Sequence, residues 1–220
     1  AARQLASQVK GQKLIVGAVI GPFSLPSMLM GTMRFLELLV VDELRDKWLG
    51  RLLSTMSQYV VRWANAQLSA GCDIVVMAEG ISSASVITPE LFERYARPTI
   101  AETISRISGP VGFEFVGAAM PMLTLAKGMG AAAWLVGEED PVRDVRRILG
   151  RAGAIIGSVN NLKLMRWDAE RVEFEARRLI AAAGPGFILA NQGPEVPWST
   201  PDENIDALVR AARARTRRAA

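Results

Sequence analysis

Six short apolar runs divide the chain, and a turn followed by a longer amphipathic stretch separates each run from the next. Each run is too short for a typical helix and does not alternate with polar residues, which is the pattern of a strand buried on both faces. The runs are residues 14–20, 73–78, 111–116, 131–136, 154–159 and 186–190. This pattern predicts a sheet whose strands are covered on both sides.

The segments between the runs show helical periodicity at residues 43–70, 89–108, 140–149, 169–183 and 201–215. Strands that alternate with helices predict parallel pairing through right-handed crossovers, either in an open doubly wound sheet or in a barrel. No Gly-x-Gly-x-x-Gly sequence follows any run, so the open sheet lacks the phosphate-binding turn that would support it. We therefore expect a (β/α) barrel of the TIM type, in which the chemistry lies at the C-terminal ends of the strands.

The number of predicted strands is too small to close this barrel. A closed barrel of the class has eight strands, whereas the sequence supplies six and residues 1–11 resemble the end of a helix. We predict one domain over residues 1–220 that lacks the first two strand–helix units, with a basic tail at residues 209–220. Such a barrel leaves apolar faces and strand edges uncovered, so we also expect a homo-oligomer or pairing with another chain.

Composition and charge restrict the function further. Half of the 220 residues are hydrophobic and 22% are charged, as in globular proteins. No apolar stretch reaches the roughly 18 residues that a membrane span needs, and no secretory signal pattern is present. The single cysteine, Cys72, fits a reducing compartment, so we expect a cytoplasmic protein. Five arginines in the last eleven residues account for the net charge of +4, and without a groove-reading motif they do not predict nucleic-acid binding.

Three groups of residues carry a resemblance to a known superfamily. They are GPFSLPSMLMG at residues 21–31, AGCDIV at 70–75 with ITPELF at 87–92, and GFILAN at 186–191 with TPDENI at 200–205. In this order and spacing they resemble the superfamily of uroporphyrinogen decarboxylase and the corrinoid-dependent methyltransferases. The resemblance covers essentially the whole chain, and the six strands resemble the third to eighth strands of that barrel.

The resemblance implies either decarboxylation or methyl transfer. The positions at which this chain departs from the residues of the superfamily favour methyl transfer. The decarboxylases use an aspartate from an N-terminal strand that this chain does not contain, a tyrosine where it has Met28, and a histidine, of which it has none. The thiol methyltransferases bind zinc through a His-x-Cys pair and a later cysteine, but here the pair reads Glu114-Phe115-Val116. We therefore expect a methyltransferase-like enzyme without a metal site, with cobalamin carried by a partner corrinoid protein. A carboxy-lyase-like enzyme and a non-catalytic barrel subunit remain as alternatives.

Polar residues at the ends of the predicted strands form the candidate site. We expect them to converge on one face and to bind a small-molecule substrate there. Carboxylates that share a cavity repel when ionised, which raises a pKa or requires a cation. Glu114 lies between two phenylalanines within a strand, where an acid is costly without a function. The predicted catalytic residues are Glu79, Glu114 and Glu138, and the predicted contacts to the methyl-carrying group are Gly21, Phe23, Met28, Asn160 and Asn191. The alternative is that these residues are helix caps and solvated loop positions.

Overall fold

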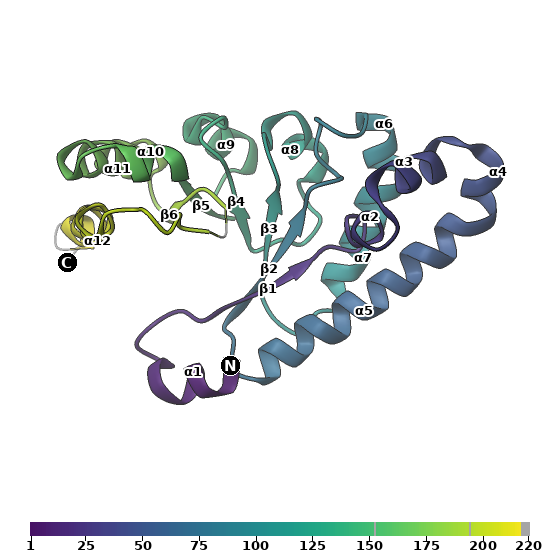
Figure 1. Cartoon of the computed structure of the whole chain (residues 1–220), viewed down its shortest axis with the longest axis horizontal. Coiled ribbons are helices and arrows are strands. Elements are labelled where there is room, and N and C mark those ends of the chain that lie inside the picture. Colours follow the sequence, from purple (N-terminus) through teal and green to yellow (C-terminus); the bar gives the residue numbers. More distant parts are fainter. Residues whose placement is uncertain (152, 194, 217–220) are drawn as a thin grey trace.

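The computed structural model of the chain describes residues 1–151, 153–193 and 195–216. Its centre is one six-stranded sheet, in which every strand is parallel to its neighbours and the spatial order follows the sequence (Figure 1). The strands are β1 (Val16–Ile20), β2 (Ile74–Glu79), β3 (Val111–Phe115), β4 (Ala133–Leu135), β5 (Ala154–Val159) and β6 (Phe187–Asn191). All six predicted strands and their parallel pairing are confirmed.

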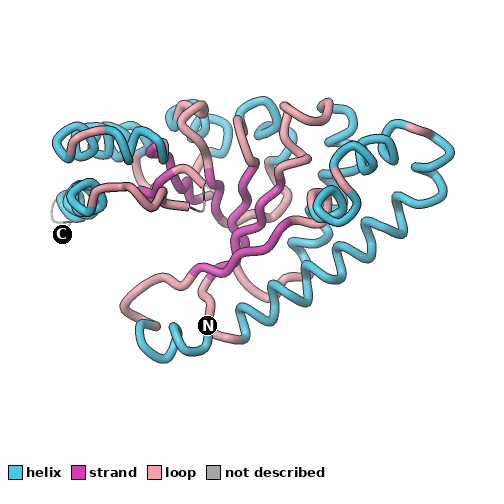
Figure 2. Tube along the Cα trace, viewed as in Figure 1, coloured by secondary structure: helices cyan, strands magenta, loops and turns pink. Residues whose placement is uncertain are grey.

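Helices follow the strands, as expected for a (β/α) barrel (Figure 2). The long ones are α5 (Gly50–Ser69), α11 (Ala169–Ala183) and α12 (Asp202–Thr216), and the medium ones are α1 (Ala2–Val9), α3 (Thr32–Val40), α7 (Arg97–Ser105), α8 (Met120–Ala126) and α9 (Val142–Leu149). The short ones are α2 (Leu25–Met30), α4 (Asp42–Leu44), α6 (Pro89–Leu91) and α10 (Asn161–Arg166), together with two π-helical turns, η1 (Arg45–Leu49) and η2 (Phe92–Ala96). None of these helices is long and apolar enough to cross a membrane. The last residues of the predicted basic tail, 217–220, lie outside the described part of the chain.

The two faces of the sheet have different surroundings. Successive side chains of a strand point to opposite faces, and α5 packs on β1 and β2 while α11 packs on β5 and β6. The helix-covered face holds the core, with Val75, Met77, Phe113, Trp134 and Ile155 all buried. The other face, which we call the open face, carries Val16, Ala18, Ile20, Val76, Ala78, Glu114, Leu135, Ile156 and Ile188. Val16 is 52% exposed and Ile188 43%, so the side that would form the barrel interior is accessible.

The free edge of β1 is partly occupied by a side chain from α5. The carboxamide of Gln67 accepts a hydrogen bond from the Ala18 N–H (3.0 Å) and donates one to the Ala18 carbonyl (2.9 Å). These are the two backbone groups that a further parallel strand would use at this position. Gln67 therefore protects the middle of an edge that would otherwise be a template for strand addition.

The Gln67→Ala substitution is expected to increase self-association, because it frees both backbone groups of Ala18. Two hydrogen bonds at about 1 kcal/mol each correspond to roughly thirtyfold tighter strand-edge pairing. Sedimentation velocity over a range of protein concentrations measures this, with the exposed Gln58→Ala on the same helix as a control. Identical sedimentation of the wild type and the Gln67→Ala variant at every concentration would show that the β1 edge does not mediate association.

Candidate active site

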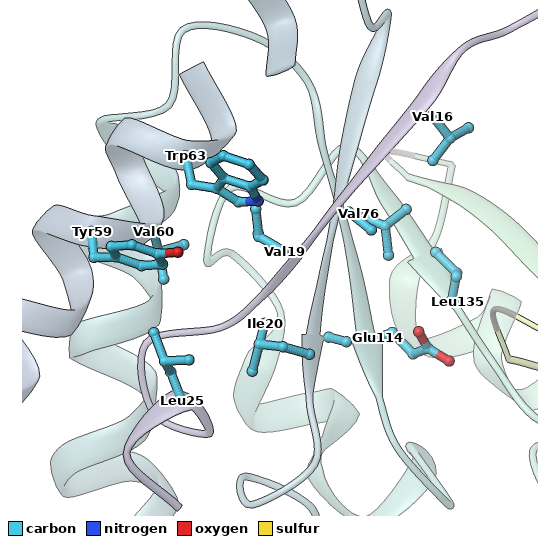
Figure 3. A pocket seen from close by; sticks show the side chains of 12 residues that line it. Val16, Val19, Ile20, Leu25, Tyr59, Val60, Trp63, Val76, Glu114 and Leu135 are labelled. Atoms are coloured by element: carbon cyan, nitrogen blue, oxygen red, sulfur yellow. The ribbon is translucent and has the colours of Figure 1, made fainter. Parts of the chain in front are cut away.

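A cavity of about 580 Å³ lies on the open face of the sheet and continues around the edge of β1 to α5 (Figure 3). Strand residues such as Ile20, Val76 and Leu135 line one side of it, and Tyr59 and Trp63 of α5 line the other. Most of these side chains are apolar, and of the described residues that line the cavity only Glu114 carries a charge. The cavity therefore suits an apolar or small group that reacts beside a single carboxylate.

Glu114 occupies the fourth position of β3, close to the C-terminal end of the strand. Its neighbours in register on the open face are Ala78 of β2 and Leu135 of β4, neither of which offers a polar side chain. No hydrogen bond or ion pair to its carboxylate is formed by the part of the chain that the structure describes. Partial burial without such partners raises the pKa of the Glu114 carboxyl above its usual value. A carboxyl in this state holds a proton more readily than an exposed glutamate does, which suits it to accept and return one.

Glu79 lies at the last position of β2 and points to the helix-covered face, where it is fully buried. Its Oε1 accepts a hydrogen bond from the Phe23 N–H (2.9 Å), and its Oε2 is 2.5 Å from the Ser24 hydroxyl. The same hydroxyl accepts a hydrogen bond from the Ile81 N–H (3.0 Å). Glu79 therefore fixes the turn between β1 and α2 from the neighbouring strand.

Burial dominates the titration of Glu79. Removal of its carboxylate from water raises the pKa from 4.5 to about 7, and the hydrogen bonds from Ser24 and Phe23 oppose only part of this rise. The side chain of Asp140, after β4, is also buried. It accepts hydrogen bonds from the N–H groups of Ala119 (2.9 Å) and Met120 (2.8 Å) at the start of α8. Glu79 thus holds the loop that follows β1, and Asp140 holds the loop that follows β3.

The predicted convergence of Glu79 and Glu114 is wrong. Ala78, not Glu79, pairs with Glu114 in the register between β2 and β3, so the two carboxylates point to opposite faces of the sheet. Glu79 faces the helices and the turn after β1, while Glu114 faces the cavity. A role for Glu79 in the site would be to position the Gly21–Ser24 turn.

The turn after β1 carries three residues predicted to contact a methyl-carrying group, and the structure separates them. A side chain at Gly21 would lie 2.1 Å from the Glu79 Oε1, so glycine is required for the close approach. Phe23 is fully buried against Phe35, with ring centroids 5.3 Å apart, and is a core residue rather than a surface for a ligand. Met28 lies on α2 and is 67% exposed. Of the three, only Met28 presents its side chain to solvent.

A polar network connects the loops after β4, β5 and β6. Glu138 forms an ion pair with Lys163 of α10. Gln192 accepts hydrogen bonds from the Glu138 N–H (3.2 Å) and from the Asn160 side chain (3.5 Å), and it donates to Glu139 (3.1 Å). The predicted proximity of the strand ends is therefore confirmed for Glu138 and Asn160, whereas Lys163 was not anticipated because it lies one helical turn beyond its strand.

The asparagines of this network hold loops in place. The Asn160 Oδ1 caps α10 by accepting from the N–H groups of Leu162 and Lys163. The Asn191 side-chain amide donates to the Asn161 Oδ1 (3.1 Å) and to the Glu195 carbonyl (2.9 Å). The side chains of Asn160 and Asn191 thus already have partners within the protein. This is expected if they are helix-cap and loop residues rather than contacts to a ligand.

The side chains of this chain cannot bind zinc in the way that the thiol methyltransferases of the resembled superfamily do. The chain has no histidine, and its single cysteine, Cys72, is buried just before β2, at the opposite end of the strands from Glu114. The described residues contain no group of three or more His, Cys, Asp or Glu side chains that could hold a metal ion. We therefore derive no chemical step through zinc.

Comparison with known families agrees with this fold. The sequence profile described as uroporphyrinogen decarboxylase (URO-D) matches residues 1–215. The chain belongs to the uroporphyrinogen decarboxylase family. The family resemblance inferred from the sequence is thus confirmed.

Relatives within this family include both kinds of enzyme. A methylcobamide:CoM methyltransferase of Methanosarcina barkeri is 22% identical over 90% of this chain and 57% of its own length. A uroporphyrinogen decarboxylase of Methylobacillus flagellatus is 24% identical over 97% of this chain and 62% of its own length. A solved methyltransferase structure from Methanosarcina mazei superposes with a TM-score of 0.88 at 21% identity, covering 97% of this chain and 62% of that one. The six strands are therefore a segment of a (β/α) barrel, and the chain spans less than two thirds of these relatives.

Proposed function

We propose that this chain is a methyltransferase-like member of the uroporphyrinogen decarboxylase family, which transfers a methyl group between a corrinoid carried by a partner protein and a small acceptor. The observation that carries the proposal is Glu114, a carboxyl without polar partners in an apolar cavity at a strand end. Supporting it, several relatives are named as methylcobamide:CoM methyltransferases. Met28, Asn160 and Asn191 remain candidate contacts to the carrier, and Glu138 a further candidate acid or base.

Glu114 would take the proton from the thiol that accepts the methyl group. A methylated corrinoid supplies a methyl group while its cobalt keeps both electrons of the broken bond. An acceptor thiol forms the new sulfur–carbon bond and must lose its proton, and the Glu114 carboxylate in the cavity is the group that would take it. The side chains of Ile20, Val76 and Leu135 beside Glu114 are apolar, so they would make the surroundings of this proton transfer less polar than water.

Decarboxylation of a porphyrinogen is the less favoured alternative. A substrate with many carboxylates requires cationic side chains around it. The described residues that line the Glu114 cavity include no arginine or lysine, and Glu114 itself would repel such a substrate. The cavity therefore supports a neutral or weakly charged reacting group.

The proposal is tested by anaerobic methyl transfer with free methylcob(III)alamin as the donor. Coenzyme M and 2-mercaptoethanol serve as thiol acceptors, and absorbance follows the loss of the cobalt–carbon bond. The proposal expects a rate that depends on both the protein and the acceptor. A folded protein that gives no acceleration over buffer with either thiol would rule out methyl transfer to thiols.

Chelation is expected to leave this rate unchanged, because no zinc site can be built from one cysteine and no histidine. The measurement compares activity before and after mild treatment with EDTA, alongside elemental analysis of the purified protein. Stoichiometric zinc that survives chelation, or loss of activity that zinc restores, would contradict the prediction. Carboxylate-bound magnesium would not, since oxygen ligands suit that ion.

A further inference from the structure

A second cavity lies away from the sheet, on the helices that follow β1. Helices α3 and α4 and the start of α5 project from the body of the molecule, with α4 at the far end of this projection (Figure 1). Between α3, η1 and α5 lies a groove of about 460 Å³, which we call the arm groove. It shares no lining residue with the Glu114 cavity, so it is a separate surface.

The floor of the arm groove is apolar. Leu38 of α3 is buried beneath it, Met30 and Leu52 are half-buried, and Leu44 and Trp48 are exposed at 36% and 46%. Exposure of a large indole and a leucine around one depression is unusual for surface side chains that have no partner. The groove is therefore a candidate for contact with another apolar surface.

Exposed methionine and leucine side chains also lie on α2 and at the start of α3, close in sequence to the groove residues Met30 and Arg34. Met33 is 77% exposed, and Met28 and Leu29 are each 67% exposed on the adjoining helix α2. Methionine side chains are flexible and adapt to irregular partners, so they are frequent on surfaces that bind helices.

The rim of the arm groove is cationic, and no acidic side chain is among the described residues that line the groove. Arg34 and Arg51 line it. Neither arginine forms an ion pair within the described part of the chain, although Glu37 lies one turn from Arg34 on α3. Lys47 adds a third positive charge, 5.1 Å from the centre of the Trp48 ring.

The neighbouring arginine shows that pairing is available in this region. Arg45 forms ion pairs with Asp42 and Asp46, and these acids are thereby engaged away from the groove. Arg34 and Arg51 remain as unpaired cations beside an apolar floor. A partner with acidic residues next to an apolar stripe would satisfy both features at once.

We propose that the arm groove binds an amphipathic helix of another protein, with its apolar stripe on the Trp48 side and acidic residues against Arg34 and Arg51. A groove between two helices accepts a third helix through side chains at i, i+3, i+4 and i+7. A second copy of this chain fits less well, because a two-fold contact places the same cations opposite each other. An anionic membrane also fits less well, because the apolar side chains of the groove line a depression rather than a projecting ridge.

The test uses two synthetic helical peptides with the same leucine and methionine stripe, one flanked by glutamates and the other by lysines. Titration calorimetry is expected to show micromolar binding of the acidic peptide and at least tenfold weaker binding of the basic one. The Arg34→Glu/Arg51→Glu variant should weaken the acidic peptide at least tenfold. The Arg62→Glu/Arg166→Glu variant, which reverses two exposed charges outside the groove, should bind as the wild type does.

Five outcomes would overturn the proposal. The first four are no binding of the acidic peptide up to about 1 mM, equal binding of both peptides, binding that the Arg34→Glu/Arg51→Glu variant retains, and occupation of the groove by a second copy of this chain. The fourth is measured by whether Trp48→Ala abolishes concentration-dependent dimerisation in light scattering. Binding to phosphatidylglycerol vesicles that the Arg34→Glu/Arg51→Glu variant loses, without peptide binding, would assign the groove to a membrane instead.

Discussion

The protein is expected to lose stability as the pH rises through about 7, and the Glu79→Gln substitution should remove most of this loss. The folded-state pKa of Glu79 is raised from 4.5 to about 7, so the folded protein holds a proton that the unfolded chain releases. The stabilisation is fully present below about pH 4.5 and disappears as the pH passes through about 7. A shift of this size corresponds to about 3 kcal/mol between the two limits.

Urea unfolding at about pH 4.5, 6 and 8 measures this dependence. The Glu79→Gln variant keeps the shape of the side chain and an acceptor for the Phe23 N–H, but it does not ionise. The difference in unfolding free energy between wild type and variant should therefore change with pH in the direction stated. The exposed Glu170→Gln on α11 is the control and should follow the wild type. Parallel pH curves for wild type and Glu79→Gln would show that the buried carboxyl does not titrate in this range.

The Glu114→Gln substitution is expected to lower the rate of methyl transfer by about 10²- to 10⁴-fold, the usual contribution of a positioned proton acceptor. The amide fills nearly the same volume, so the apolar cavity and the strand pairing on either side should persist. Unchanged unfolding free energy of the variant would separate this effect from a loss of structure. Glu170→Gln again serves as the control, and Glu114→Asp should recover part of the rate because it restores a carboxylate. A Glu114→Gln variant as active as the wild type would remove Glu114 from the reaction.

The strands were predictable from the sequence because strands buried on both faces have continuous apolar runs. Residues 154–159, for example, form β5 with the predicted bounds. The short helices α2 and α10 were not predicted, since six residues are too few to show a helical period.

The faces of the strands were the main feature that the sequence did not resolve. The predicted strand ended at residue 78, which left Glu79 beyond it with no defined direction. In the structure β2 includes Glu79, and the two-residue period of the strand then directs it to the helices. Both faces of β2 carry apolar residues, so no alternation of polarity marks this difference in the sequence.

Glu114 was recognised for a physical reason that the structure supports. An acid between Phe113 and Phe115 must point to the face opposite these two rings, which are buried on the helix-covered side. The Gln67 contact with Ala18 could not be foreseen, because it joins residues 49 positions apart through side-chain geometry alone. Contacts of this kind depend on the tertiary placement of α5 along β1.

The pH dependence of methyl transfer from methylcob(III)alamin to the neutral thiol 2-mercaptoethanol, compared between wild type and Glu114→Gln, is the measurement that decides whether Glu114 accepts the proton. Burial raises the pKa of the Glu114 carboxyl, so the wild-type rate should increase as this group ionises and becomes able to accept a proton. Below the pKa of the thiol, both proteins receive the acceptor in its protonated form, so in that pH range the ratio of the two rates isolates Glu114. The account predicts a ratio that rises with pH from near one to at least about 10² as the carboxyl ionises. A ratio that stays constant across the pH range would contradict the assignment of Glu114 as the proton acceptor.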